Sequence, residues 1–234
     1  MSVLNSSSGF ARVSILVAFV SAAWVVGVGH FVAAGDWPQI LGPHRNGIAH
    51  DEALAERWPN EGPPIRWSRT VGSGNAGMAV AGETGVLFHR RGNREIIAAV
   101  DVATVEPVWV KSHPTTFVPQ VGSDDGPLCV PTIAERSVVT FGAQGVLTCS
   151  DLRTGEQIWQ RNTHDEFAAL PGYFGAGSSP LAYEDRVIVN VGGHKTGAGV
   201  VAFSLADGSV LWQATDERAS YAAPVAAAFD GEPT

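Results

Sequence analysis

A pair of adjacent carboxylates is the first feature of this 234-residue chain that could do chemistry. Asp124 and Asp125 stand in the glycine-bounded sequence Gly122-Ser-Asp-Asp-Gly126. Carboxylate oxygens are the ligands that Ca²⁺ prefers, so the pair could contribute to a cation site. The same composition is typical of a solvated turn, and we expect that structural role here.

Seven histidines are the other candidate metal ligands, among them His89, His113, His164 and His194. Zinc sites draw their ligands from short, regular spacings, which these histidines do not have. His113, His164 and His194 are predicted to lie in loops that could meet on one face of the molecule. From their spacing we expect no metal site.

The sequence Gly72-Ser-Gly-Asn-Ala-Gly77 fits the glycine spacing of a dinucleotide-binding turn. Such a turn binds pyrophosphate with amide groups at the start of a helix. Gly82 and Gly85 follow too soon for a helix to form. We therefore predict a loop between two sheets.

No nucleophile stands in a catalytic sequence context. Ser178 and Ser179 precede Pro180 at the predicted start of a strand, without a nucleophile elbow. Cys129 and Cys149 are expected on the first and third strands of one sheet, roughly 9–10 Å apart and too far for a disulfide. We predict two buried free thiols, and no catalytic, cofactor-binding or metal-binding residue.

A repeated phrase that ends in tryptophan determines how these residues are positioned. Trp109, Trp159 and Trp212 are spaced by 50 and 53 residues, a period typical of propellers and solenoids. A unit of this length cannot bury its apolar face alone, so the copies must stack. Other positions repeated within the phrase are Asp101, Asp151, Thr154, Gly155 and Gly208.

Each copy is predicted to form a four-stranded antiparallel sheet. In the clearest copy we expect strands at residues 128–133, 137–141, 146–150 and 157–161, and the neighbouring units span about residues 77–111 and 179–214. Pro131, Pro180 and Pro224 fall at first-strand starts, where a missing amide costs little. The predicted fold is all-β: a partial, open β-propeller with about three complete four-stranded blades.

The tryptophans are expected to fill the space between neighbouring blades. Outer strands diverge because circumference grows with radius, and a large flat side chain fills that wedge. Trp67 resembles a fourth-strand tryptophan that no blade precedes, and residues 221–229 resemble a first strand that no blade follows. We expect a truncated ring that needs several more blades; closure as a four-bladed ring is the alternative.

Composition divides the chain into three regions. Residues 1–35 are expected to be a signal peptide or an uncleaved membrane anchor with a hydrophobic helix, because residues 13–35 carry no formal charge and Arg12 precedes them. Residues 36–64 are rich in Pro and Gly and should be irregular, and residues 65–234 form the partial propeller. Arg12 should stay inside, so the rest is exported: periplasmic, or anchored to the cytoplasmic membrane and facing outward.

The net charge of −8 argues against nucleic acid as a partner, because an acidic surface repels phosphate backbones. Contact with a membrane is expected only through the N-terminal segment, if that segment stays uncleaved.

The phrase Asp-x-x-Thr-Gly-x-x-x-Trp at residues 151–159 resembles the repeat of PQQ-like β-propellers, the group around quinoprotein alcohol dehydrogenases and the outer-membrane assembly propeller lipoprotein. An exported bacterial group of PQQ-binding-like repeat proteins is more similar still. Its members share the patterns Asp-Trp-Pro-Gln-x-x-Gly-Pro-x-Arg-x-Gly, Gly-Pro-Pro-x-x-Trp and Gly-Ser-Gly, which are found here at Asp36 to Gly47, Gly62 to Trp67 and Gly72 to Gly74. The resemblance implies seven or eight blades, so that this chain would be an N-terminal fragment.

The resemblance also bears on function. Quinoprotein dehydrogenases hold PQQ with a disulfide between adjacent cysteines, a tryptophan floor and Ca²⁺-ligating acids, whereas Cys129 and Cys149 are not adjacent and no carboxylate matches a calcium ligand by motif. We therefore predict a non-catalytic binding or scaffold module that holds a protein or small-molecule ligand on a propeller face, without a cofactor. The alternative is a PQQ-dependent and Ca²⁺-dependent oxidoreductase whose active site lies partly in a missing C-terminal half. A third hypothesis is an assembly subunit at the outer membrane.

Overall fold

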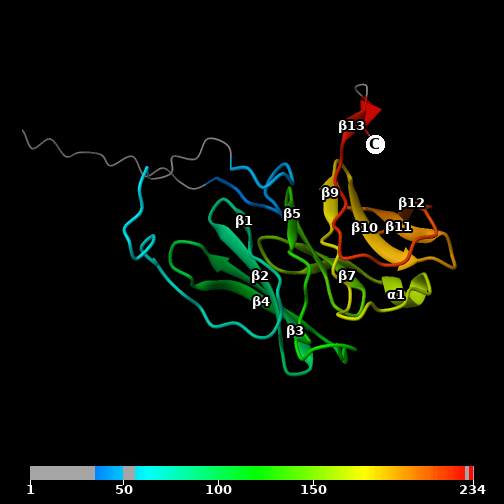
Figure 1. Ribbon diagram of the computed structural model, residues 1–234, viewed down its shortest axis with the longest axis horizontal. Coiled ribbons are helices and arrows are strands. Elements are labelled where there is room, and N and C mark those ends of the chain that lie inside the picture. Colours follow the sequence, from blue (N-terminus) through cyan, green and yellow to red (C-terminus); the bar gives the residue numbers. More distant parts are fainter. Residues whose placement is uncertain (1–34, 50–55, 230–231, 234) are drawn as a thin grey trace, which may run out of the picture. The chain divides into compact units, whose positions relative to one another are not determined.

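The computed structural model describes residues 35–49, 56–229 and 232–233 of the chain. Twelve of its strands, β1 to β12, form three four-stranded antiparallel sheets, in each of which neighbours along the chain are neighbours in the sheet (Figure 1). The first sheet consists of β1 (Ala79–Ala81), β2 (Thr84–Arg91), β3 (Arg94–Asp101) and β4 (Pro107–Pro114). The second consists of β5 (Thr132–Ala134), β6 (Ser137–Phe141), β7 (Val146–Asp151) and β8 (Gln157–Asn162). The third consists of β9 (Leu181–Tyr183), β10 (Arg186–Gly193), β11 (Ala198–Ser204) and β12 (Val210–Ala214).

The second sheet follows its predicted strands except at its first strand. β6 has the predicted bounds, and β7 and β8 each extend one residue further. β5 begins only at Thr132 instead of residue 128, because Pro131 has no amide to donate. The amide of Val130 donates to the hydroxyl oxygen of Ser179 at 2.9 Å, so this stretch is hydrogen-bonded to the third blade rather than to its own.

Both faces of the second sheet are buried, because successive side chains of a strand point to opposite faces. Leu147 and Cys149 of β7 pack in one apolar core with Val201 of the third sheet. Val138 of β6 packs in a second core with Trp109 of the first sheet. The innermost strands are in contact in chain order, β1 with β5 and β5 with β9. Face-to-face stacking of this kind makes the three sheets consecutive blades of a partial β-propeller.

The predicted first strand at residues 221–229 is largely absent. Residues 221–227 form no strand, and only β13 (Ala228–Phe229) pairs, with β14 (Glu232–Pro233). A first strand needs the second strand of its own blade as a hydrogen-bonding partner, and the described residues contain none for 221–227.

The segment of residues 36–49 crosses the innermost strands. The backbone groups of Trp37 and Val80 of β1 exchange two hydrogen bonds of 2.9 Å. The carbonyl oxygen of Pro38 accepts a 2.7 Å bond from the amide of Ile133 in β5. This segment therefore contacts the first and second blades in turn.

Arg45 continues the same path to the third blade and beyond. Its guanidinium is buried, with 5% of the residue exposed, and donates to the carbonyl oxygens of Pro180 and Pro224, the latter at 2.7 Å. Burial lowers the pKa of this guanidinium to about 10, so it is still charged at neutral pH. A single arginine thus ties the start of β9 to the segment that follows the third blade.

The predicted signal or anchor lies outside the described residues except for Gly35. In the part of the chain that the structure describes, no helix has the length and apolar character needed to cross a bilayer.

Candidate binding face

Connections gather at two ends of the sheets, because alternate connections of a meander lie at opposite ends. We call one end the turn face; it carries the tight turns at residues 102–106, 152–156 and 205–209. We call the other the linker face; it carries the hairpins at 92–93, 142–145 and 194–197 and the linkers 115–131, 163–180 and 215–227. The long connections that follow each of the three sheets are therefore all on the linker face.

The repeat aspartates organise the turn face. The carboxylate of Asp151 accepts bonds from the amides of Arg153 and Thr154, at 3.0 and 2.8 Å, and from the Thr154 hydroxyl at 3.0 Å. Asp101 accepts the equivalent bonds within its own turn. The amide of the turn threonine is the main reason why the pKa of each carboxyl is held below its ordinary value. The Asp101 and Asp151 carboxylates therefore serve to hold the backbone of their own turns.

The third blade builds the same turn with a displaced acid. Ser204 stands at the position of Asp151, and its amide and carbonyl bond within the turn as those of Asp151 do. The carboxylate comes instead from Asp207, which accepts from the amide and hydroxyl of Ser209 at 3.0 and 2.8 Å. These bonds, the amide first, lower the pKa of Asp207.

Two tryptophans join consecutive blades by one repeated contact. The indole nitrogen of Trp109 donates to the carbonyl oxygen of Leu152 at 2.8 Å, and that of Trp159 donates to Leu205 at 2.8 Å. Both residues are at most 9% exposed. Each indole lies on the turn glycine of the next blade, Gly155 beneath Trp109 and Gly208 beneath Trp159.

Trp67 and Trp212 extend the series at its two ends. Trp67 donates to the carbonyl oxygen of Val102 at 2.9 Å, although residues 65–72 form no strand. Trp212 is 38% exposed and meets no following blade within the described chain. Trp67 therefore makes the contact of a fourth-strand tryptophan on the first blade without a strand of its own.

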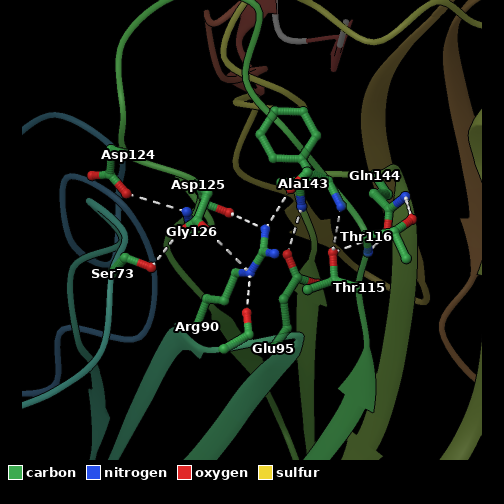
Figure 2. A network of polar contacts seen from close by, with 12 residues as sticks. Ser73, Arg90, Glu95, Thr115, Thr116, Asp124, Asp125, Gly126, Ala143 and Gln144 are labelled. Atoms are coloured by element: carbon green, nitrogen blue, oxygen red, sulfur yellow. Dashed lines mark hydrogen bonds and ion pairs between the residues drawn. The ribbon is translucent and has the colours of Figure 1, made fainter.

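A buried carboxylate fastens the first blade to the second on the linker face (Figure 2). Glu95 of β3 is 1% exposed. One oxygen accepts from the amide of Ala143 at 2.9 Å, and the other lies 2.9 Å from Nε2 of His113. Gln144, in the same hairpin as Ala143, accepts from the Thr116 amide at 2.8 Å. The hairpin at 142–145 is thus fixed to the first blade through Ala143 and to the linker that follows this blade through Gln144.

Arg90 fixes the first linker in the same way (Figure 2). Its guanidinium donates to the carbonyl oxygens of Phe117 at 2.6 Å and Asp125 at 3.0 Å, and lies 3.4 Å from the Asp125 carboxylate. Asp125 also accepts from the Ser73 hydroxyl at 2.6 Å, and Asp124 accepts from Asn75 at 2.7 Å. The acidic pair is therefore engaged by an arginine and by a neighbouring loop.

That neighbouring loop is the glycine-rich sequence at residues 72–77. It contains no helix, and Ser73 pairs with Arg90 of β2 through two backbone bonds of 2.8–2.9 Å. A Cβ added at Gly72 would lie 1.7 Å from the carbonyl oxygen of Arg90. Position 72 therefore requires glycine, because the backbones of the loop and of β2 lie too close together for a side chain.

The histidines singled out from the sequence do not come together: His113, His164 and His194 line three different cavities, and His89 lines none of these three. His113 lies on β4, not in a loop as predicted, and His89 of β2 accepts from the Gly72 amide at 3.1 Å. His164 lies in α1 (Thr163–Glu166), where burial lowers the pKa of its imidazole. Nδ1 of His194 is shielded from solvent and meets no partner in the described chain. Within residues 35–49, 56–229 and 232–233, no three His, Cys, Asp or Glu side chains form a metal site.

Two adjoining cavities open on the linker face. The larger, which we call the linker cavity, has a volume of about 570 Å³. Leu170, Tyr173, His194, Arg218 and Tyr221 are among its lining residues. The smaller has about 340 Å³ and shares Gln120, Pro171 and Gly172 with it. Because all three linkers contribute, no single repeat contains this site.

The cysteines do not fit a PQQ site of the kind that the resemblance implies. Both are free and buried, and their thiols donate to different carbonyl oxygens, Cys129 to Ala176 and Cys149 to Leu205. Burial raises the pKa of both thiols, that of Cys149 to about 11. The residues present therefore do not offer the disulfide that such a site uses.

Sequence reasoning missed the residues that build the linker face. Glu95 and Arg90 are charged residues inside strands, next to a hairpin. That position is the only feature of the sequence that could have indicated their role. Arg218 and Tyr221 lie outside the repeated phrase. Their position in the linker cavity can be seen only in the folded structure.

Three stacked four-stranded blades joined through repeat tryptophans define a partial propeller of the PQQ-like class. The chain belongs to the family PQQ_2, described as "Outer membrane protein assembly factor BamB", whose model matches residues 49–233. A curated relative, "Outer membrane protein assembly factor BamB" from Burkholderia pseudomallei (strain K96243), is 31% identical over 144 residues. That match covers 59% of this chain and 32% of the relative, so the chain spans about a third of the relative's length.

Solved structures of the same superfamily are similar at low identity. BamB from Moraxella catarrhalis is 18% identical, with 69% of this chain and 58% of that chain covered and a TM-score of 0.42. Quinohemoprotein alcohol dehydrogenase from Comamonas testosteroni is also 18% identical, with 76% and 26% covered and a TM-score of 0.46. The family assignment rests on the family model and not on these overlays.

Proposed function

We propose that this chain is part of an exported propeller of the outer-membrane-assembly type, which binds segments of other proteins on its linker face. The observation that carries the proposal is the concentration of exposed apolar side chains on the three linkers. Val118, Leu170 and Tyr173 are 77%, 58% and 64% exposed, and Tyr221 is 46% exposed. Apolar and aromatic groups exposed beside a cavity are typical of protein-binding surfaces.

The family and the named relative support both parts of the proposal. The relative is described as an outer membrane protein assembly factor, and such a role requires export and contact with other proteins. The attachment of the 142–145 hairpin by Glu95 and of the first linker by Arg90 supports it as well, because a preformed surface loses less entropy on binding.

A site-specific crosslinking experiment tests this function. A photoreactive amino acid replaces Tyr173 on the linker face in the full-length protein in its native cells, and the matched control replaces Glu106 on the turn face. We expect adducts with an outer-membrane or assembly protein, identified by mass spectrometry, from position 173 and not from position 106. Equal adducts from both positions, or adducts from 106 alone, would refute the assignment of the linker face.

We also propose that the described residues carry no cofactor-dependent chemistry of their own, given the positions of Cys129 and Cys149. The chain is incubated with PQQ and Ca²⁺ and assayed for dye-linked alcohol oxidation. Turnover above that of a heat-denatured sample would favour the quinoprotein alternative.

A further inference from the structure

We infer that the linker cavity binds the carboxylate of an acidic residue in an extended segment of a partner protein. A neighbouring apolar side chain of that segment then packs against Tyr173 and Leu170. The inference rests on the proposed function and names the chemistry of the segment that the linker face recognises.

The cavity is held open by hydrogen bonds among its walls. The amide of Gln120 in the first linker donates to the carbonyl oxygen of Tyr173 in the second at 2.9 Å. The hydroxyl of Tyr221 in the third linker accepts a 3.0 Å bond from the amide of Phe174. The three linkers therefore support one another, and the cavity does not depend on a ligand to form it.

The backbone behind the cavity is closely packed too. A Cβ added at Gly192 would lie 2.1 Å from the amide nitrogen of Ala219, and one added at Gly177 would lie 2.3 Å from the Tyr221 ring. The Ser220 amide donates to the side-chain oxygen of Asn190 at 3.0 Å. The third linker is thus held at residues 219–221 by β10 of the third blade and by Gly177 of the second linker, and this places Arg218 and Tyr221.

Two donors that are available to an anion line this cavity. Tyr221 accepts a bond from the Phe174 amide, so its own hydroxyl proton can be donated to a ligand. Arg218 lines the cavity and makes no hydrogen bond or ion pair within the described residues. A guanidinium presents two parallel N–H groups that match a carboxylate.

Charge complementarity decides the sign of the ligand. The chain carries a net charge of −8, yet no Asp or Glu is among the residues that line the linker cavity, whereas Arg218 and His194 are. Arg218 is the one permanently charged residue of this lining, and it favours an acidic group over a lysine side chain in the cavity. The exposed rings and Leu170 beside it suit an apolar neighbour of that acid.

Two blocked tetrapeptides test the inference on the full chain, acetyl-Ala-Phe-Asp-Ala-amide and its asparagine counterpart. Their binding is measured by chemical-shift titration or calorimetry, with Arg218→Gln and Tyr221→Phe as variants. Arg186→Gln is the matched control, since Arg186 is a partly exposed arginine at the start of β10 that pairs with Glu184 and Asp185 and does not line the linker cavity. We expect the Asp peptide to bind about tenfold more tightly than the Asn peptide, because a bond to a charged group is worth about 1.5 kcal/mol or more.

Arg218→Gln should reduce that preference to about onefold, Tyr221→Phe should reduce it partly, and Arg186→Gln should leave it unchanged. Equal affinity for the two peptides, or a preference that survives Arg218→Gln, overturns the inference. Inorganic phosphate that binds at the same residues while neither peptide does also overturns it, in favour of a small-anion site. In each of these cases crosslinks from position 173 would still support the proposed function, so the two failures are distinguishable.

Discussion

The indole of Trp109 in the first blade lies directly on Gly155 in the second. A Cβ added at Gly155 would come within 2.5 Å of Cε3 of that indole, and Gly155 has a φ of +70°. Trp159 and Gly208 repeat the relationship one blade further, at 2.6 Å from Cδ2 and a φ of +71°. The tryptophan of one copy of the repeated phrase therefore packs against the glycine of the next copy.

Gly155→Ala is expected to lower the free energy of unfolding by about 2–4 kcal/mol, because the left-handed backbone and the displaced indole both cost energy. The matched control is Gly197→Ala: Gly197 also has a φ of +70°, but a Cβ there would meet nothing within 4 Å. Gly197→Ala should lower the free energy of unfolding by only about 1 kcal/mol, because it adds the cost of the left-handed backbone but no contact with an indole. Equal losses in urea unfolding would show that the indole contact contributes nothing.

Val105→Gly is expected to raise the free energy of unfolding, by up to about 1 kcal/mol. Val105 stands where the other turns have glycine, and its φ is +64°, a conformation that β-branched residues rarely adopt. Val102→Gly in the same turn is the control, since Val102 does not have a positive φ and gains no relief. The urea midpoints of the two variants should move in opposite directions; a loss at position 105 would argue against strain there.

Arg45→Lys is expected to destabilise the fold by about 2–4 kcal/mol despite the retained charge. A lysine cannot reach Gln39, Pro180 and Pro224 together, and it leaves buried carbonyl oxygens without donors. Hydrogen exchange should rise in residues 181–183 and 225–227, on either side of the lost contacts. Arg186→Lys at the surface should change stability by no more than about 0.5 kcal/mol. Unchanged hydrogen exchange at residues 225–227 would show that Arg45 does not hold the segment after the third blade in place.

Acid should destabilise the turn face through its aspartates. The folded-state pKa of the Asp151 carboxyl lies below its unfolded value of about 3.8, so the carboxylate contributes stability above that pH, and the contribution is lost as pH falls through the folded pKa. Asp151→Asn should flatten the decline in stability below about pH 4, and Thr154→Val should flatten it less because the amide donor remains. The check is urea unfolding between pH 2.5 and 6; a decline unaltered by Asp151→Asn would exclude this group.

The fold was largely predictable because each blade is local in sequence. Strands joined by turns of a few residues pair with their neighbours, so alternation and turn residues suffice to place β6, β7 and β8 within a residue. The error at β5 arose because Pro131 has no amide to donate and the amide of Val130 bonds to Ser179 at the end of the second linker. A partner 49 residues away leaves no local signal.

The amino-acid sequence by itself determined the blades, because a spaced phrase of aspartate, glycine and tryptophan specifies one turn and one packing contact per repeat. Only the tertiary structure decided the linker face. Gln120, Tyr173 and Tyr221 belong to three linkers that have no shared pattern, and they meet because stacking the blades brings the ends of β4, β8 and β12 to one side. The packing between blades repeats with a period that is visible in the sequence. The cavity between the linkers depends instead on distances between residues far apart in the chain, and these are set only when the blades stack.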